Sequence, residues 1–385
     1  MNKSGFMRKI FEPIYNSSRR IPKSINNYIK DLTENQKKQI KEKIDSINSK
    51  YNSIVFLKKP KCSYKHIDPM FFSFENLPPF GKEYWFMKFV PEQKNTNEKR
   101  QLLAMFGRST ENIKINKKHV KTKNISGKHS GFMNSWFFDK KKNLVVDNKC
   151  SISILPDKIT AEEKDTVIEF TGKYPKYNLK ILKTGKKGKN NKTICNLEIN
   201  KPKDSKTPYK FRSFFKLFAG FALINIYFDF SGELHEKPFK GKCYIQKVIL
   251  IGPFIPWYWG RIVFANGSVL KYYMPKIEVF GISYKLLSDL VFYNSEEQKL
   301  YEFEGLKIKK IGKDKPLFII TDSKNKFHAI IETYSSQEFL FVKTSKFRYT
   351  EYLAKVKKIC INNHEITDKF GGGIGLVEEA RGYVP

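Results

Sequence analysis

Residues 261–273 read Arg261-Ile-Val-Phe-Ala-Asn-Gly-Ser-Val-Leu-Lys-Tyr-Tyr273, and this stretch decides the fold. β-branched and aromatic residues, which favour strands, stand on both sides of Asn266-Gly267. Asn-Gly readily takes the positive φ angles of a two-residue type I′ turn. The stretch therefore predicts a β-hairpin and, with it, an antiparallel sheet.

Similar short runs fill the chain from residue 54 onward. Each run is rich in β-branched and aromatic residues and is bounded by Gly, Pro, Asn, Asp or Lys, a pattern typical of strands. We count about eighteen such runs, among them Cys150–Leu155, Glu302–Ile308, Phe327–Glu332 and Glu338–Lys343. About eight strands already close a small barrel around one ligand, so this number predicts two barrels packed together.

The length of the chain agrees with two domains. Its 385 residues are about twice as many as a typical domain holds. Residues 1–52 are polar and basic, and Ile40, Ile44 and Ile47 are spaced to lie on one stripe of a helix. We therefore predict a partly helical N-terminal arm over residues 1–52, a first β domain over 53–236 and a second over 237–385.

The net charge of +34 arises from 72 basic and 38 acidic residues. Such an excess favours anionic partners, either nucleic acid or the phosphates of a membrane surface. Only nine of the basic residues are arginine, which argues against nucleic acid because base and phosphate recognition favours the guanidinium group. The lysine excess also fits the codon bias of an AT-rich genome, with no binding role at all.

Three features predict a cytoplasmic protein. The five cysteines are odd in number and form no C-x-x-C pair, as expected for reduced thiols. The first twenty residues lack the apolar core of a secretory signal. The longest apolar stretch, Leu217 to Phe230, is shorter than the roughly 20 residues of a membrane-spanning helix. The lysines also allow docking at the inner face of the membrane.

The segment before the hairpin, Gly252-Pro-Phe-Ile-Pro-Trp-Tyr-Trp-Gly-Arg261, suggests a ligand site. On a strand, Trp257, Trp259 and Arg261 share one face. Two indole rings beside a guanidinium form a flat wall that stacks on a conjugated ligand or stabilises a developing carbocation. The alternative is that both tryptophans only fill a core.

Two motifs, residues 256–268 (Pro-Trp-Tyr-Trp-Gly-Arg-Ile-Val-Phe-Ala-Asn-Gly-Ser) and 375–383 (Gly-Leu-Val-Glu-Glu-Ala-Arg-Gly-Tyr), resemble the superfamily of carotenoid 1,2-hydratase, tocopherol cyclase and the related lipocalin-like Diels-Alderases. Trp85 and Trp136 add weaker support to the resemblance. We predict that they bind ligand together with Trp257, Trp259 and Arg261. The hydratase-like members carry His-x-Trp-Gly where this chain has Trp257-Tyr-Trp259-Gly260, a departure that argues against hydratase activity in particular.

The resemblance implies a mainly β fold of two lipocalin-like (calycin-type) antiparallel barrels. It further implies a lipophilic small molecule bound near their junction, and chemistry that begins by protonating or orienting an isoprenoid or polyene. It implies no metal and no nucleotide cofactor. The six histidines show no zinc-binding spacing, in agreement with this expectation.

A protonating mechanism needs a carboxylic acid that an apolar environment keeps neutral. Asp229, Glu278 and Glu378 lie within otherwise apolar strands and are the candidate catalytic acids, and Tyr284 is a candidate to orient a substrate. The alternative for each acid is a solvent-facing or ion-paired carboxylate. Glu379 and Arg381, two residues apart, are predicted to form such an ion pair, since they share one strand face.

The leading hypothesis is a lipocalin-like enzyme that hydrates, cyclises or isomerises C=C bonds by acid-base or template catalysis. One alternative is a non-catalytic carrier of lipophilic ligands that docks on anionic membranes. Another is a nucleic-acid-binding β protein, in which basic loops track phosphates. The sequence indicates no oligomeric state.

Overall fold

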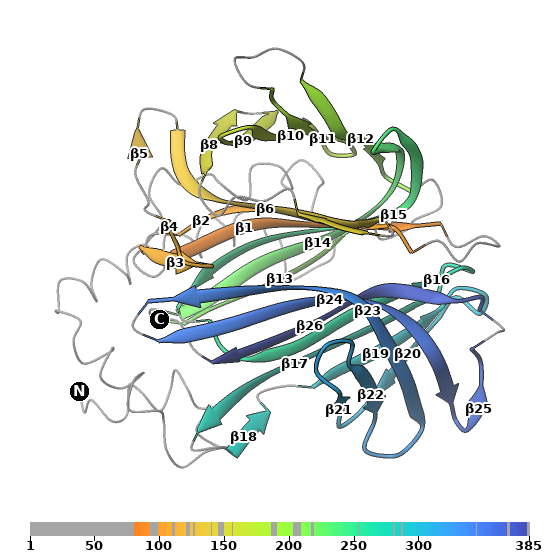
Figure 1. Cartoon of the computed structure of the whole chain (residues 1–385). Coiled ribbons are helices and arrows are strands. Elements are labelled where there is room, and N and C mark those ends of the chain that lie inside the picture. Colours follow the sequence, from red (N-terminus) through yellow and green to blue (C-terminus); the bar gives the residue numbers. More distant parts are fainter. Residues whose placement is uncertain are drawn as a thin grey trace.

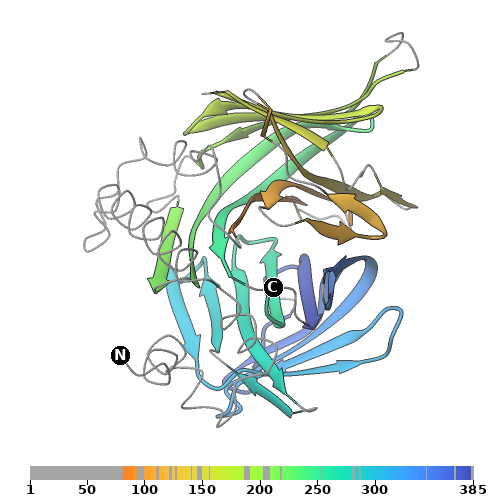
Figure 2. The same ribbon diagram turned by 90° about the vertical axis from the view of Figure 1, so that its left-hand side faces the viewer.

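The structure is a computed structural model in which every described element is a strand (Figure 1). It describes residues 81–92, 99–109, 112–120, 124–125, 128–139, 141–144, 150–155, 157–185, 191–202, 209–216, 219–252, 254–279, 282–285, 288–343, 345–367 and 370–382. The predicted helical arm over residues 1–52 lies outside these residues. The strands form two antiparallel sheets, each with its own core, and the two sheets lie one above the other in Figures 1 and 2.

The first sheet closes into a barrel because β12 pairs with β11 on one side and with β14 on the other. Ten strands form the closed ring. Three further strands pair with members of the ring: β5 and β7 with β6, and β13 with β14. The bounds are β1 (Gly81–Pro91), β2 (Gln101–Ser109), β5 (Asn124–Ile125), β6 (Lys128–Asp139), β7 (Lys141–Leu144), β8 (Cys150–Leu155), β9 (Lys158–Glu163), β10 (Thr166–Lys173), β11 (Lys176–Lys183), β12 (Lys192–Asn200), β13 (Tyr209–Lys216), β14 (Ala219–Leu234) and β15 (Lys237–Ile251).

The second sheet runs in the order β20-β19-β17-β16-β26-β24-β23-β22-β21 and curls around its own core (Figure 2). Two strands from the first half of the chain, β3 and β4, join it through β23, so the halves of the chain are interlocked. The bounds are β3 (Ile113–Ile115), β4 (Lys118–Val120), β16 (Trp257–Phe264), β17 (Val269–Val279), β18 (Ile282–Lys285), β19 (Asp289–Asn294), β20 (Lys299–Phe303), β21 (Lys307–Ile311), β22 (Leu317–Thr321), β23 (Phe327–Val342), β24 (Lys346–Ile361), β25 (His364–Glu365) and β26 (Gly373–Gly382).

The predicted hairpin at Asn266-Gly267 is confirmed as β16 and β17, but its turn is of a different type. Gly267 takes a φ of 89°, whereas Asn266 is not among the residues with positive φ. The Gly267 amide donates to the Phe264 carbonyl at 3.0 Å and the Phe264 amide to the Ser268 carbonyl at 2.9 Å. These bonds define a three-residue loop with glycine in the left-handed position, the commonest alternative to the type I′ turn.

Two other strand predictions need correction. The runs Phe327–Glu332 and Glu338–Lys343 belong to one long strand, β23, which carries irregularities in its pairing near Ile331 and Thr333. The run Glu302–Ile308 is not one strand, because the chain turns at Gly305, where φ is 68°. Glycine tolerates this left-handed conformation, and the turn sends β20 and β21 to opposite edges of the sheet.

The chain passes from the first sheet to the second after β15, further along than the predicted boundary between residues 236 and 237. His235 and Glu236, both with positive φ, form the tight turn that joins β14 to β15 within the first barrel. The next strand, β16, begins at Trp257 and belongs to the second sheet.

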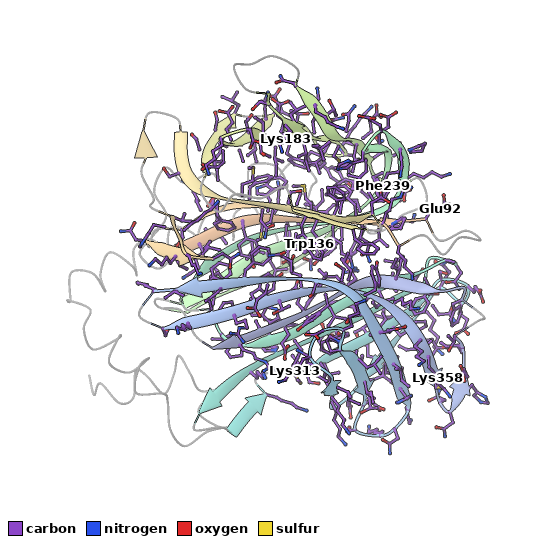
Figure 3. All side chains as sticks on the ribbon, in the orientation of Figure 1. Glu92, Trp136, Lys183, Phe239, Lys313 and Lys358 are labelled. Atoms are coloured by element: carbon purple, nitrogen blue, oxygen red, sulfur yellow. The ribbon has the colours of Figure 1, made fainter. Side chains whose placement is uncertain are left out.

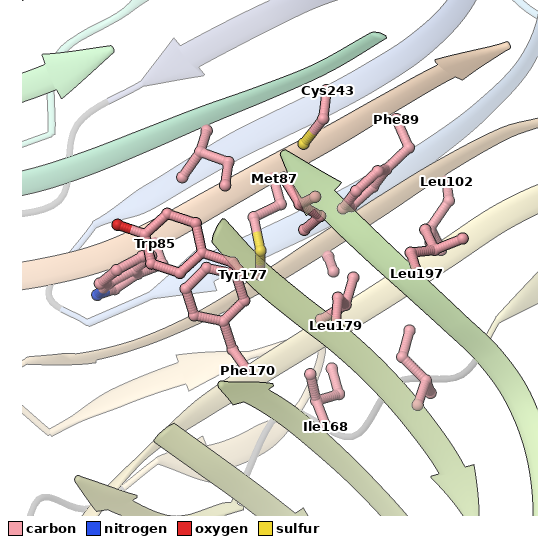
Figure 4. Close-up of a cluster of buried hydrophobic side chains, with 14 of the residues drawn as sticks. Trp85, Met87, Phe89, Leu102, Ile168, Phe170, Tyr177, Leu179, Leu197 and Cys243 are labelled. Atoms are coloured by element: carbon pink, nitrogen blue, oxygen red, sulfur yellow. The ribbon is translucent and has the colours of Figure 1, made fainter. Parts of the chain in front are cut away.

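Alternation along the strands produces three apolar regions. Odd-numbered residues of β1, such as Trp85, Met87 and Phe89, point into the first barrel (Figure 4). A second core fills the curl of the second sheet around Phe292, Phe318 and Tyr352. A third cluster draws on both sheets and forms the layer between them. We call this third cluster the inter-sheet layer; Trp136 marks its position in Figure 3.

Candidate functional site

One face of β16 points into the inter-sheet layer. Trp257 and Trp259 contact this layer and Arg261 continues the same face, as the sequence predicts. Trp259 stacks on Tyr244 of the first barrel, with 6.0 Å between ring centroids and 28° between planes. The Arg261 guanidinium lies 4.5 Å from the Tyr244 ring centroid and 4.3 Å from that of Tyr227. Together these side chains form an aromatic wall across the two sheets.

Glu378 on β26 faces the same layer. Its side chain is 8% exposed, and Trp257 Nε1 donates a hydrogen bond of 3.0 Å to its Oε2. Burial and the neighbouring carboxyl of Glu351 raise the pKa of Glu378 to about 8, although hydrogen bonds from Trp257 and Tyr349 and the nearby Lys88 act in the opposite direction. At neutral pH this carboxyl keeps its proton and is able to act as an acid.

A second carboxyl, Glu351 on β24, is the direct cross-strand partner of Glu378. Trp136 Nε1 donates to its Oε2 at 2.5 Å, and the Tyr349 hydroxyl donates to its Oε1 at 2.8 Å. Burial raises the pKa of Glu351 to about 7, and these two bonds partly oppose the effect. Because one pKa lies at neutral pH and the other just above it, Glu378 holds a proton while Glu351 is partly ionised, which suits them to act as acid and base.

Three tyrosines surround the carboxyl pair. Burial, and then the charges of the glutamates, raise the pKa of Tyr84, Tyr273 and Tyr349 above the usual value of a phenol. Their rings therefore stay neutral. They present hydroxyl donors and aromatic faces to the layer.

Lys88 on β1 brings an amine into the layer from the first barrel. It is fully buried, and its Nζ donates to the Arg261 carbonyl oxygen at 2.9 Å. Burial and the nearby Arg261 guanidinium lower the pKa of Lys88 well below its ordinary value, although Glu378 and Glu351 act in the opposite direction. At neutral pH the layer thus holds one protonated acid, one partly ionised acid and a neutral amine beside the permanent cation of Arg261.

The structure brings only some of the predicted site residues together. Trp257, Trp259, Arg261, Glu378 and Trp136 meet in the inter-sheet layer. Trp85 lies instead inside the first barrel, with Lys247 Nζ 3.5 Å from its ring centroid. The roles predicted for these residues in ligand binding and catalysis stay predictions.

The remaining predicted residues lie away from this group or outside the described side chains. Asp229 sits near the solvent on β14, 46% exposed, and forms a salt bridge of 2.5 Å with Lys242. Glu278 on β17 and Tyr284 on β18 belong to paired strands, but their side chains lie outside the described residues.

Sequence reasoning missed Glu351 and Lys88. The local pattern around Glu351 is Tyr349-Thr-Glu-Tyr-Leu353, in which two adjacent polar residues stand between tyrosines and do not single out an acid. Lys88 is one of 63 lysines in the chain and belongs to no recognisable motif. The one usable signal was its place within the aromatic run Tyr84-Trp-Phe-Met-Lys-Phe89, where a lysine is unexpected.

A separate polar network lies in the second sheet, on the opposite face of β26. Glu379 accepts hydrogen bonds from Lys310 at 2.6 Å and from the Tyr258 hydroxyl at 2.9 Å. Arg381 Nε also donates to Glu379 at 2.8 Å, which confirms the predicted pair. Burial raises the pKa of Glu379, but the bonds and charges of Lys310 and Arg381 outweigh it and the net pKa is lowered.

Within the described ranges, no three His, Cys, Asp or Glu side chains are arranged to hold a metal ion. The described part of the chain also contains no helix that is long and apolar enough to span a membrane.

No protein-family model matches the sequence, and no curated protein matches it either. Two solved structures are similar over most of their length. The crystal structure of CghA with Sch210972 is 7% identical, with 79% of this chain and 88% of that chain covered and a TM-score of 0.37. That of kievitone hydratase from Nectria haematococca is 8% identical, with 82% and 94% covered and a TM-score of 0.36. At these values neither match assigns a function to this chain.

Proposed function

We propose that the inter-sheet layer is the active site of an enzyme that protonates C=C bonds of a lipophilic isoprenoid or polyene. The observation that carries this proposal is the cross-strand pair Glu351 and Glu378, two buried carboxyls with pKa values of about 7 and about 8 in an aromatic environment. Burying two carboxyls opposite each other destabilises a fold, and pairs of this kind are concentrated at functional sites.

In this mechanism Glu378 donates its proton to one carbon of the double bond. The C=C π electrons form the new C–H bond, and the neighbouring carbon becomes a carbocation. Glu351, ionised in part, then removes a proton from an adjacent carbon and forms a shifted double bond, which is an isomerisation. The attack of another C=C on the cation before this step gives a ring, which is a cyclisation.

The aromatic wall stabilises the cation. Trp259 and Tyr244 present ring faces, whose quadrupole attracts a positive charge by about 1–2 kcal/mol per well-placed ring. Trp257 and Tyr349, whose centroids are 5.6 Å apart, lie beside the two carboxyls. Loss of a proton, in place of hydration, agrees with the departure from the His-x-Trp-Gly motif, because this chain has Trp257 at the position of the histidine.

Incubation of the protein with its co-purified lipophilic ligand in D₂O tests the proposal. The ligand is first extracted into organic solvent and identified by mass spectrometry. Protonation at carbon followed by loss of a proton leaves one deuterium per turnover, which mass spectrometry of the product detects. Deuterium uptake that disappears in Glu378→Gln supports the acid role.

A matched control is Glu338→Gln, since Glu338 is a half-exposed acid paired with Arg348 on the same sheet. It should take up deuterium as the wild type does. Ligand that binds but never gains deuterium would favour the carrier instead of the enzyme.

A further inference from the structure

The proposed mechanism makes no use of Lys88, although its environment is unusual for a lysine. Its side chain is 0% exposed, and a charged ammonium carries three N–H donors that all need acceptors when buried. Among the described residues Lys88 has one hydrogen-bond acceptor, the Arg261 carbonyl at 2.9 Å, and no salt bridge. A neutral amine, with two donors and a free lone pair, fits this environment better than an ammonium.

The groups around Lys88 maintain the neutral amine. Arg261 supplies a permanent positive charge beside it, and a neighbouring cation in an apolar site is one of the established ways to activate a lysine. The Arg261 guanidinium is itself buried, 6% exposed, between tyrosine rings. Its Nη1 has no hydrogen-bond partner among the described residues. The layer therefore combines a nucleophile with an unused donor for an oxygen atom.

We infer that Lys88 is a nucleophile that forms an imine with the carbonyl carbon of a lipophilic aldehyde bound in the inter-sheet layer. This inference uses the site of the proposed function but not its protonation at carbon. The ligand class it adds is an isoprenoid-like chain that ends in an aldehyde.

The step balances with groups already present. The lone pair of Lys88 Nζ attacks the carbonyl carbon, the C=O π electrons move to oxygen, and Glu378 supplies a proton to that oxygen. The nitrogen passes a proton to the Glu351 carboxylate. Glu351, now protonated, gives this proton to the hydroxyl, which leaves as water while the C=N bond forms, and the iminium nitrogen loses its remaining proton to the Glu378 carboxylate. Amine and aldehyde thus give imine and one water, and no oxidant or reductant is consumed.

The test is reductive trapping of the full-length protein with citronellal, a ten-carbon isoprenoid aldehyde, and sodium cyanoborohydride at pH 7. Exposed lysines are protonated at this pH and react slowly, whereas a neutral Lys88 reacts first. We expect one adduct per chain by intact mass, and peptide mapping should locate it at Lys88. Citronellol, the matching alcohol, should leave no adduct because it has no carbonyl group.

Two lysine variants serve as the comparison. Lys88→Met should lose the adduct and should stay folded, because methionine fills a similar volume without a polar group. Lys82→Met is the matched control, since Lys82 lies on the same strand, is 2% exposed and donates to the Gly252 carbonyl; it should keep the adduct. If circular dichroism shows Lys88→Met to be unfolded, the peptide maps of the wild type and of Lys82→Met decide whether the adduct lies at Lys88.

Adducts distributed over surface lysines, with none at Lys88, would overturn the inference. Failure of this test is distinct from failure of the proposed function. Trapping at Lys88 without deuterium uptake keeps the imine and removes the acid catalysis. Deuterium uptake without an adduct at Lys88 keeps the acid catalysis and removes the imine.

Discussion

Glu378 and Glu379 are neighbours on β26, both nearly buried, and yet their carboxyls behave in opposite ways. Adjacent residues of a strand point to opposite faces, so Glu378 enters the inter-sheet layer and Glu379 enters the second sheet. Glu379 meets Lys310, Tyr258 and Arg381, and its pKa is lowered. Glu378 meets the Trp257 indole, the Tyr349 hydroxyl and a second acid, Glu351, and its pKa rises to about 8.

Burial alone therefore does not decide the state of a carboxyl in this protein. Both side chains lose water, which disfavours the charged form in each case. Two cations reverse this effect at Glu379 and produce a stabilising ion pair. At Glu378 no salt bridge forms within the described residues, and a proton takes the place of the cation. The ion pair of Glu379 stabilises the fold, whereas the protonated carboxyl of Glu378 can donate its proton in a reaction.

The substitution Glu378→Gln should have the largest effect on activity. Glutamine keeps the shape and accepts the Trp257 hydrogen bond but has no proton to donate. General acid catalysis typically contributes about 10²–10⁴-fold, so we expect the rate of deuterium incorporation to fall by roughly that factor. Stability should stay unchanged or rise, since a buried carboxyl is removed. A variant that retains more than a tenth of the wild-type rate would exclude Glu378 as the acid.

The matched substitution Glu379→Gln should affect the fold instead. It removes the acceptor of Lys310, which is only 18% exposed and would be left as a buried charge with the Tyr352 hydroxyl as its remaining partner. Breaking a largely buried pair in this way costs about 3 kcal/mol of unfolding free energy. Urea denaturation at pH 7 measures this value. An equal loss in Glu378→Gln would show that the two acids do not differ as described.

The pair Glu351 and Glu378 should also make the protein less stable as pH rises from about 5 to 8. In this range the unfolded carboxyls have lost their protons while the folded ones retain them, because their folded pKa values are about 7 and about 8. The folded state then binds more protons, so the free energy of unfolding falls with pH, by on the order of a few kcal/mol over the range. Glu379, with its lowered pKa, contributes stability that is lost only as pH falls through its carboxyl range.

Urea denaturation at several pH values between 5 and 8 measures this slope. The double substitution Glu351→Gln, Glu378→Gln should flatten it, and the difference between the two proteins cancels the contribution of other groups. Parallel slopes in both would show that the two carboxyls ionise normally in the folded state.

The sequence was sufficient for the parts of this comparison that depend on alternation. The Trp257, Trp259 and Arg261 face, the acid Glu378 and the Glu379–Arg381 pair all follow from counting residues along one strand. The sequence alone could not predict how one sheet packs on the other. Asp229 shares a face with Tyr227, but it lies near the solvent, and no local pattern distinguishes this position from a covered one.

Glu351 and Lys88 were missed for the same reason. Their neighbours in the site come from distant strands: Trp136 is 215 positions from Glu351, and Arg261 is 173 positions from Lys88. A single sequence carries no signal for such pairings. What it does carry is the misfit of a charged residue in an aromatic run, which identifies Lys88 in retrospect.

The smallest predicted effect concerns the one donor that reaches Glu378 from β16. The hydrogen bond from Trp257 Nε1 stabilises the ionised carboxylate, so Trp257→Phe should raise the pKa of Glu378 further. The alkaline limb of the activity profile should then move to higher pH, while the rate at pH 7 changes only a few-fold because the phenyl ring preserves most of the wall. Trp259→Phe is the control: Trp259 also faces the layer, but it makes no hydrogen bond to either acid within the described residues. A shift of the limb in both variants would assign the effect to packing, whereas a shift in Trp257→Phe alone would show that the Trp257 N–H lowers the pKa of Glu378 against the larger effect of burial.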